Sequence, residues 1–190
     1  MGTRNLTAVM LDGEYKVAQY GQWDGYPSGQ GATVLLFCRE LLKNNRALFE
    51  EKLRAARWIE DEEVVELGER WKMRFPHLSR DICAKILNTV LTEPNGIVLQ
   101  NNIAFAGESL FCEFAYVIDL DKNTLEVFTG FNKSPLSEGD RFYEIPVSSD
   151  VMHDGTTKYY QVRLAESYSL DHLPDQEQFE KDLWEEDDEE

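Results

Sequence analysis

The chain begins with a pattern of strand-forming residues that predicts a β-hairpin. Residues 5–11 and 14–20 are rich in apolar, β-branched and aromatic side chains, and Asp12-Gly13 separates the two runs. A type I′ turn needs positive φ angles at both of its central residues, and Asp-Gly is among the pairs that adopt them most readily. We therefore expect two antiparallel strands joined by a two-residue turn.

The next part of the chain follows helical patterns. Residues 32–45 are apolar nearly all round in their first half, which is typical of a deeply buried helix, and Asn44-Asn45 marks its expected end. Residues 46–58 place apolar side chains along one side and predict a second helix.

Further helical patterns lie on either side of Pro76. Residues 60–75 are expected to be mostly helical, with Gly68 as a weak point. Beyond Pro76, apolar residues recur at helical spacing over 80–92, and Ser79 is placed to cap the helix that they predict.

The last third of the chain is strand-like. Residues 110–120 and 124–130 flank Asp121-Lys122-Asn123, a second hairpin signal, and further strands are predicted near 140–146 and 158–165. The regular alternation of strands and helices that builds parallel βαβ units is missing. We therefore expect an α+β fold in which an antiparallel sheet, built from the N-terminal hairpin and a C-terminal meander, carries three to four helices on one face.

Charge changes this picture mainly at the C-terminal end. The formal net charge is −17 at pH 7. Residues 171–190 hold eleven acids against Lys181 and contribute −10, while residues 1–170 hold 25 acids and 18 bases and contribute −7. A field of this sign disfavours direct nucleic-acid binding and suits a basic surface on a protein partner. We therefore divide the chain into a single domain over 1–170 and an acidic tail over 171–190, whose charge serves either solubility or binding.

The acidic tail also contains apolar residues that a purely solvated segment would lack. Pro174 is placed to open a short helix that carries Phe179, Leu183 and Trp184. These side chains are expected to dock either on the domain itself or on a partner. The residues assigned to partner binding are Phe179, Trp184, Glu185, Glu186, Asp187 and Asp188.

Motifs for common enzyme chemistry are missing from the sequence. The three histidines are isolated and Cys38, Cys83 and Cys112 are widely spaced, so we expect neither a metal nor a cofactor. The pair Gly29-x-Gly31 lacks the third glycine of a dinucleotide fingerprint, because Val34 occupies that position. With no secretory signal and no long apolar run, we expect reduced core thiols in a cytoplasmic protein without membrane spans.

One stretch, YGQWDGYPSGQG over residues 20–31, fits neither a core strand nor a helix. Backbone N–H groups before the helix, together with Arg4 on the hairpin, could bind an anion, and Trp23 and Tyr26 could stack on a planar ligand. The residues assigned to ligand binding are Arg4, Tyr20, Trp23, Asp24 and Tyr26. The alternative is a structural turn, in which Asp24-Gly25 is ordinary turn chemistry and the aromatic side chains anchor the loop.

The opening of the chain is similar to that of a group of small, largely uncharacterised phage and prophage proteins. Those proteins begin M-G-T-R or M-C-T-R and continue, after a short hairpin, into an aromatic–x–x–aromatic–D-G-Y-P stretch followed by glycines. The matching residues here are Met1-Gly2-Thr3-Arg4 and the stretch from Tyr20 to Pro27, and Gly2 lacks the thiol of the Cys-bearing relatives. The resemblance implies a mobile-element origin and an accessory role that modifies or blocks host machinery. It brings no established activity or ligand.

Three functions stay open on the sequence. The first is an accessory protein that binds a host macromolecule, with inhibition of a bacterial defence or nucleic-acid-handling system as a candidate role. The second is a small-molecule binder or hydrolase that holds a nucleotide-like ligand in the loop around Asp24. The third is an interaction domain with no site in that loop. We favour the first, because the resemblance, the missing catalytic motifs and the acidic surface support binding.

Overall fold

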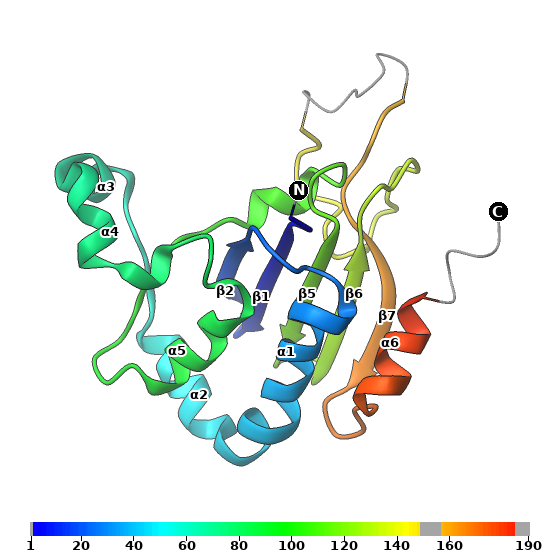
Figure 1. Ribbon diagram of the computed structural model, residues 1–190, viewed down its shortest axis with the longest axis horizontal. Coiled ribbons are helices and arrows are strands. Elements are labelled where there is room, and N and C mark those ends of the chain that lie inside the picture. The colour runs from blue at the N-terminus through cyan, green and yellow to red at the C-terminus, as the bar shows by residue number, and fades with distance from the viewer. Residues whose placement is uncertain (1, 149–156, 185–190) are drawn as a thin grey trace.

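A mixed five-stranded sheet forms the centre of the protein (Figure 1). The computed structural model describes residues 2–148 and 157–184. The strand order is β2-β1-β5-β6-β7. The strands are β1 (Asn5–Leu11), β2 (Glu14–Gly21), β5 (Phe114–Asp119), β6 (Thr124–Thr129) and β7 (Arg163–Ser169). With its helices the sheet makes an α+β fold, which confirms the predicted class.

Both predicted hairpins are present. Asp12 and Gly13 have φ angles of 55° and 76°, as a type I′ turn requires, and β1 pairs antiparallel with β2. Strands β5 and β6 also pair antiparallel, with Asp119 opposite Thr124 at the turn. Local turn chemistry therefore specifies both hairpins.

One pairing in the sheet is parallel, where the sequence pattern predicted an antiparallel sheet throughout. Asn5 of β1 lies beside Phe114 of β5, and the two strands run in the same direction from there. The reason is topological. Strand β2 ends at the end of the sheet where β1 begins, and the helical segment returns the chain to that same end of the strands. A strand that starts there is parallel to β1 when it pairs with β1.

The first helical stretch bends where the sequence predicted a stop. It comprises wide turns over Pro27–Gly31 and Phe37–Leu42, with α1 (Ala32–Leu36) between them and α2 (Lys43–Ala55) after them. Asn45 has non-helical angles (φ −131°, ψ 21°) and produces a kink inside α2. The helix predicted over 46–58 ends early, because Arg57 and Trp58 form β3, which pairs with β4 (Val98–Leu99).

The helices on either side of Pro76 are shorter than predicted. Gly68, with a φ of 51°, separates α3 (Asp61–Leu67) from α4 (Trp71–Arg74), as expected for the weak point. The predicted helix over 80–92 begins only at a tight turn over Cys83–Lys85 and continues as α5 (Ile86–Thr92). The Ser79 hydroxyl accepts a hydrogen bond from the Asp81 N–H (3.2 Å), so it caps a turn ahead of the helix.

The segment over 140–146, predicted as a strand, is a series of turns. Tyr143 N–H donates to the Asp140 carbonyl and Ile145 N–H to the Phe142 carbonyl, which closes two consecutive turns. The apolar residues fit a strand pattern, but Phe142 is fully buried against the sheet instead of pairing at its edge. The other predicted strand near 158–165 exists as β7 and begins at Arg163.

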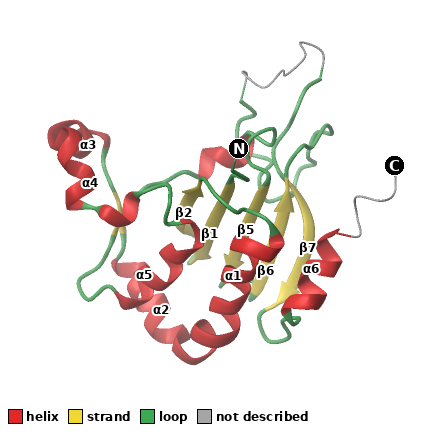
Figure 2. Cartoon of the chain, in the orientation of Figure 1, coloured by secondary structure: helices red, strands yellow, loops and turns green. Residues whose placement is uncertain are grey.

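The sheet separates two parts of the core. Helices α1, α2 and α5 cover one face, and α6 (Gln176–Trp184) lies beside β7 (Figure 2). The larger cluster, which includes Val9, Phe49 and Ile118, fills the space under the helices. The smaller cluster covers the opposite face, where loops bring Phe142 and Val162 onto the sheet.

Candidate binding loop

The loop that carries the WDGYP sequence crosses the end of the sheet at which β1 and β5 begin and β2 ends. It leaves β2 after Gly21 and reaches the first helical turn at Pro27 (Figure 1). Strands β1 and β5 both begin at this end. The loop therefore lies where three neighbouring strands either begin or end.

The backbone of the loop is fastened to the sheet by buried hydrogen bonds. Gly25 N–H donates to the Thr3 carbonyl (2.9 Å), and the Tyr116 hydroxyl donates to the Gly25 carbonyl (2.8 Å). Burial raises the pKa of Tyr116, so its hydroxyl stays protonated and available as a donor. The side-chain amide of Asn5 donates to the Trp23 carbonyl (3.2 Å). The backbone of this loop is therefore held against the sheet by residues that are distant in the chain.

Two glycines of the loop are required by close approach to the core. A Cβ atom at position 25 would lie 2.8 Å from the Thr3 carbonyl oxygen. One at position 31 would lie 2.8 Å from the Tyr116 hydroxyl. Real Cβ atoms do not approach other atoms so closely, so larger residues would push the loop off the sheet.

Trp23 is exposed and yet held on two sides. About half of the residue (48%) is accessible to solvent. Its indole N–H donates to the Asp81 carboxylate (2.8 Å). The six-membered ring lies so close to the Gly2 backbone that a Cβ atom at position 2 would overlap it. The indole is therefore fixed in place with part of its surface facing solvent.

Tyr26 and Asp24 complete the exposed part of the loop. Tyr26 is 41% exposed, and its ring centroid lies 6.1 Å from that of Phe114. Asp24 is exposed and has a φ of 56°, a left-handed conformation that Asp and Asn tolerate better than most residues. Its carboxylate lies over Gly29, where a Cβ atom would come within 2.6 Å of the carboxyl carbon.

The structure does not bring Arg4 and Tyr20 together with these three residues. Tyr20 pairs with Leu6, whose side chain belongs to the cluster on the face opposite the helices. Its ring packs 4.9 Å from that of Phe105. Arg4 precedes β1, and its backbone N–H donates to the Glu113 carboxylate (3.3 Å). The Arg4 guanidinium lies 4.5 Å from the centre of the Phe111 ring.

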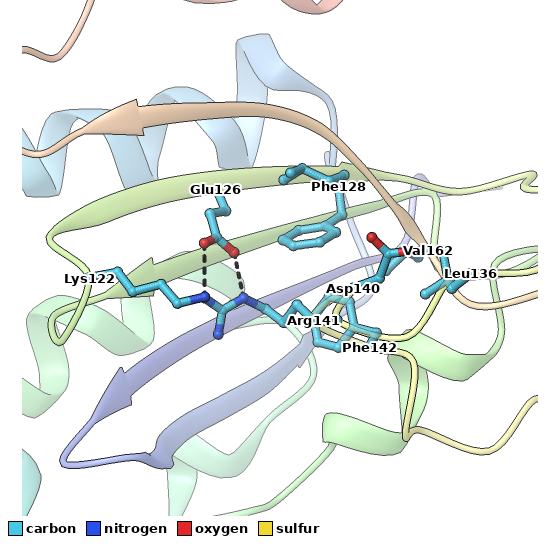
Figure 3. A pocket seen from close by; sticks show the side chains of 10 residues that line it. Lys122, Glu126, Phe128, Leu136, Asp140, Arg141, Phe142 and Val162 are labelled. Carbon is cyan, nitrogen blue, oxygen red and sulfur yellow. Dashed lines mark hydrogen bonds and ion pairs between the residues drawn. The ribbon is translucent and has the colours of Figure 1, made fainter.

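A second polar site, which the sequence analysis missed, lies on the face opposite the helices (Figure 3). Arg141 forms ion pairs with Asp119 and Glu126 while only 8% of its side chain is exposed. Burial alone would raise the pKa of Asp119 and lower that of Arg141. It is outweighed for Asp119 by the hydrogen bonds and charges of Arg141 and Lys122 together, and for Arg141 by the hydrogen bonds of Glu126, Asp119 and Tyr15 together with the charge of Glu126. The pKa of Asp119 is therefore below its usual value and that of Arg141 above it. Sequence reasoning missed this cluster because it treated 140–146 as a strand.

A small cavity of about 120 Å³ adjoins this cluster. Lys122 and Asp140 line it together with Arg141, and Phe128 and Phe142 supply part of its apolar wall (Figure 3). Pockets that hold drug-sized ligands are usually about 300–1,000 Å³. Both Glu126 oxygens already accept hydrogen bonds from Arg141. The cluster therefore joins the 131–148 segment to the sheet and leaves little polar capacity for a ligand.

The residues assigned to partner binding in the tail have different positions. Phe179 is fully buried, with its ring 5.5 Å from that of Tyr168, so it docks α6 on the domain. Trp184 is the last residue of α6. Residues 185–188, Glu185, Glu186, Asp187 and Asp188, lie outside the described residues.

Over the described ranges 2–148 and 157–184, no group of three or more His, Cys, Asp or Glu side chains could hold a metal ion. None of the helices in this part of the chain is both long enough and apolar enough to cross a membrane. Comparison with known proteins found no matching family model, curated protein or solved structure.

Proposed function

We propose that this protein is a binding protein and that the exposed part of the WDGYP loop, Trp23, Asp24 and Tyr26, contacts a host protein. The observation that carries the proposal is the state of Trp23, which is half exposed and yet fixed by Asp81 and Gly2. Aromatic side chains that are ordered before binding lose little conformational entropy when a partner covers them. Trp and Tyr are also the residues most enriched among interface hot spots.

A protein surface fits this loop better than a small ligand. Trp23 and Tyr26 project from a loop whose backbone is held against the sheet by Thr3 and Tyr116. The nucleotide-like alternative relied on Arg4 to hold a phosphate near Asp24, but the Arg4 guanidinium lies over the Phe111 ring. The cavity next to Arg141 is too small to replace that site.

Charge narrows the chemistry of the partner. The net charge of −17 and the carboxylates of Asp24 and Asp81 beside the exposed rings favour a basic surface. A Lys or Arg side chain on such a surface could lie over the Trp23 ring and gain a cation–π interaction. An accessory protein that blocks a nucleic-acid-handling or defence protein of the host fits this description, as the resemblance to phage proteins implies.

The test is affinity capture from a bacterial lysate with the full chain, followed by binding measurements with the purified partner. We expect Trp23→Ala to weaken binding at least tenfold, about 1.4 kcal/mol, because it removes the central anchor. Tyr143→Ala is the matched control, since Tyr143 is another aromatic residue with 43% exposure but lies on the 131–148 segment. Equal binding by both variants and the native chain would refute the proposal.

Two more variants separate the loop from the tail. Gly2→Ala keeps every charge and ring but pushes Trp23 out of its position, so it should weaken binding as Trp23→Ala does. A chain that ends at Trp184 lacks six acidic residues and keeps the docked helix α6. A truncation at Leu170 would remove α6 as well, so it could not test the acidic residues alone. Binding that is lost in this truncation but unaffected by Gly2→Ala would assign the interface to the tail.

A further inference from the structure

Helices α3 and α4 form an arm that projects from the body of the protein (Figure 1). We define the arm as residues 61–74, which comprise α3, the turn at Gly68 and α4. These elements pack mainly on each other and on the adjoining turn over Pro76–Leu78. No residue of α3 is buried. The short ladder of β3 and β4 lies at the base of the arm.

The arm carries the two most exposed large apolar side chains among the described residues. Val65 is 80% exposed and Met73 is 79% exposed. Val65 lies on α3, and Met73 lies on α4, beyond Gly68. Isolated helices shorter than about 12–15 residues are marginal in water, so the two short helices of the arm would gain stability from a surface that covers them.

Charge on the arm is divided into an acidic half and a basic half. Residues 61–69 contain five acids and no base, and residues 70–74 contain three bases and no acid. Exposed acids of the first half are Asp61, Glu62, Glu66 and Glu69, and exposed bases of the second half include Arg70 and Arg74. The arm as a whole carries a net charge of −2, from five acids and three bases, so it adds little of the repulsion that a −17 chain creates.

A surface divided in this way is complementary to a second copy of itself. In a two-fold interface, residue i of one copy meets residue j of its partner, and residue j of the first copy meets residue i of the partner. The acidic half of each arm would then face the basic half of the other. Val65 would face the Met73 side chain of the other copy in the same way, which would cover all four apolar side chains.

We propose that the chain self-associates through the arm, with α3 of one copy against α4 of its partner. Two helices of this length bury an area below about 1,200 Å², the range of weak and transient complexes. We therefore expect a reversible dimer with a dissociation constant on the order of tens of micromolar. Such a dimer would present two WDGYP loops, which would strengthen binding to a partner that carries two matching surfaces.

The test is sedimentation equilibrium of the full chain over a wide range of concentrations. We expect a monomer–dimer equilibrium for the native chain. Two charge-reversal variants are expected to be monomers, since each places like charges opposite one another at the substituted positions of the two copies. They are Glu62→Lys with Glu66→Lys, and Arg70→Glu with Arg74→Glu. All four residues are exposed, so circular dichroism should show that both variants keep the native fold.

Mixing the two variants provides the decisive measurement. In the mixed pair each α3 again faces an α4 segment of opposite charge, so the equimolar mixture should dimerise although neither variant does so alone. Glu138→Lys with Glu144→Lys is the matched control. It changes the net charge by the same amount as Glu62→Lys with Glu66→Lys, but at exposed positions outside the arm, so it should leave the dimer intact. A native chain that stays monomeric, or a mixture that does, would overturn the proposal. These measurements need no host partner, so their failure leaves the proposed function untouched.

Discussion

Among substitutions that remove one charged side chain, we expect Arg141→Met to lower the free energy of unfolding most. The native guanidinium joins Asp119, which is 2% exposed, and Glu126, which is also buried, on the face of the sheet opposite the helices. Met keeps an unbranched apolar stem that fills the space of the Arg141 stem, so the main change is the loss of the guanidinium cation. Two buried carboxylates then have no cation bridging them, although Lys122 still lines the adjoining cavity.

The magnitude follows from the cost of an uncompensated buried charge. Removing one partner of a buried ion pair typically costs about 3–5 kcal/mol, because the remaining charge cannot regain its hydration. Whole domains are stable by only about 5–15 kcal/mol, so the variant should lose about a fifth or more of its stability. Lys16→Met is the matched control. It removes the exposed pair with Glu14 and should cost less than about 1 kcal/mol.

The native protein and the variant should also differ in how their free energies of unfolding change with pH. In the native protein the pKa of Asp119 is below its unfolded value, because the hydrogen bonds and charges of Arg141 and Lys122 together outweigh the effect of burial. Its contribution is complete above the unfolded pKa of about 3.9 and is lost only as the pH falls through the lower folded pKa. In Arg141→Met, burial acts without the cation and raises the pKa of Asp119 above its unfolded value. The free energy of unfolding of the variant should therefore rise as the pH falls from 7 to 5. In the native protein Asp119 produces no such rise.

Urea unfolding followed by tryptophan fluorescence at pH 7 and pH 5 measures both effects. We expect a large difference in midpoint between the variant and the native protein at pH 7 and a smaller one at pH 5. A loss below about 1 kcal/mol at pH 7, comparable to that of Lys16→Met, would show that the buried cluster contributes no more than an exposed pair. An equal loss at both pH values would refute the assignment to buried carboxylates.

Three other changes test the loop and the core. Phe179→Ala removes a fully buried ring and should lower the free energy of unfolding by about 3–5 kcal/mol in urea titrations; a loss below 1 kcal/mol would mean that α6 is not docked on the core. Tyr116→Phe leaves the buried Gly25 carbonyl without its donor and should cost about 1–3 kcal/mol, and no measurable loss would mean that the hydroxyl does not hold the loop. Burial raises the pKa of the Cys38 and Cys112 thiols, so mass spectrometry should find them unmodified by iodoacetamide at pH 8 until urea unfolds the chain; rapid modification in the folded state would contradict their burial.

Turns and helix breaks that a few neighbouring residues determine could be predicted from the sequence. Asp12-Gly13 specified the first hairpin, and Asn45 and Gly68 marked the points where the helical stretches bend or break. The docking of Phe179 was one of two alternatives that the sequence left open. These features depend on backbone conformations and periodicities that act over a few residues, so the sequence carries them directly.

Features that join distant segments could not be predicted in this way. The parallel pairing of β1 with β5 depends on the end of the sheet to which the chain returns after about 90 residues of helices and loops. The apolar pattern over 140–146 suits a strand, but burial of Phe142 on the sheet and the ion pairs of Arg141 hold it in turns. Long-range packing overrode local propensity there.

The WDGYP loop shows the same division at the scale of a site. The sequence by itself determined that Trp23, Asp24 and Tyr26 belong to one glycine-rich loop, because they are close neighbours in the chain. Only the tertiary structure decided that Arg4 lies over the Phe111 ring and that Gly2 and Asp81 fix the Trp23 ring. The physical reason is that strand alternation and close packing place side chains from distant positions, and neither is encoded within the loop.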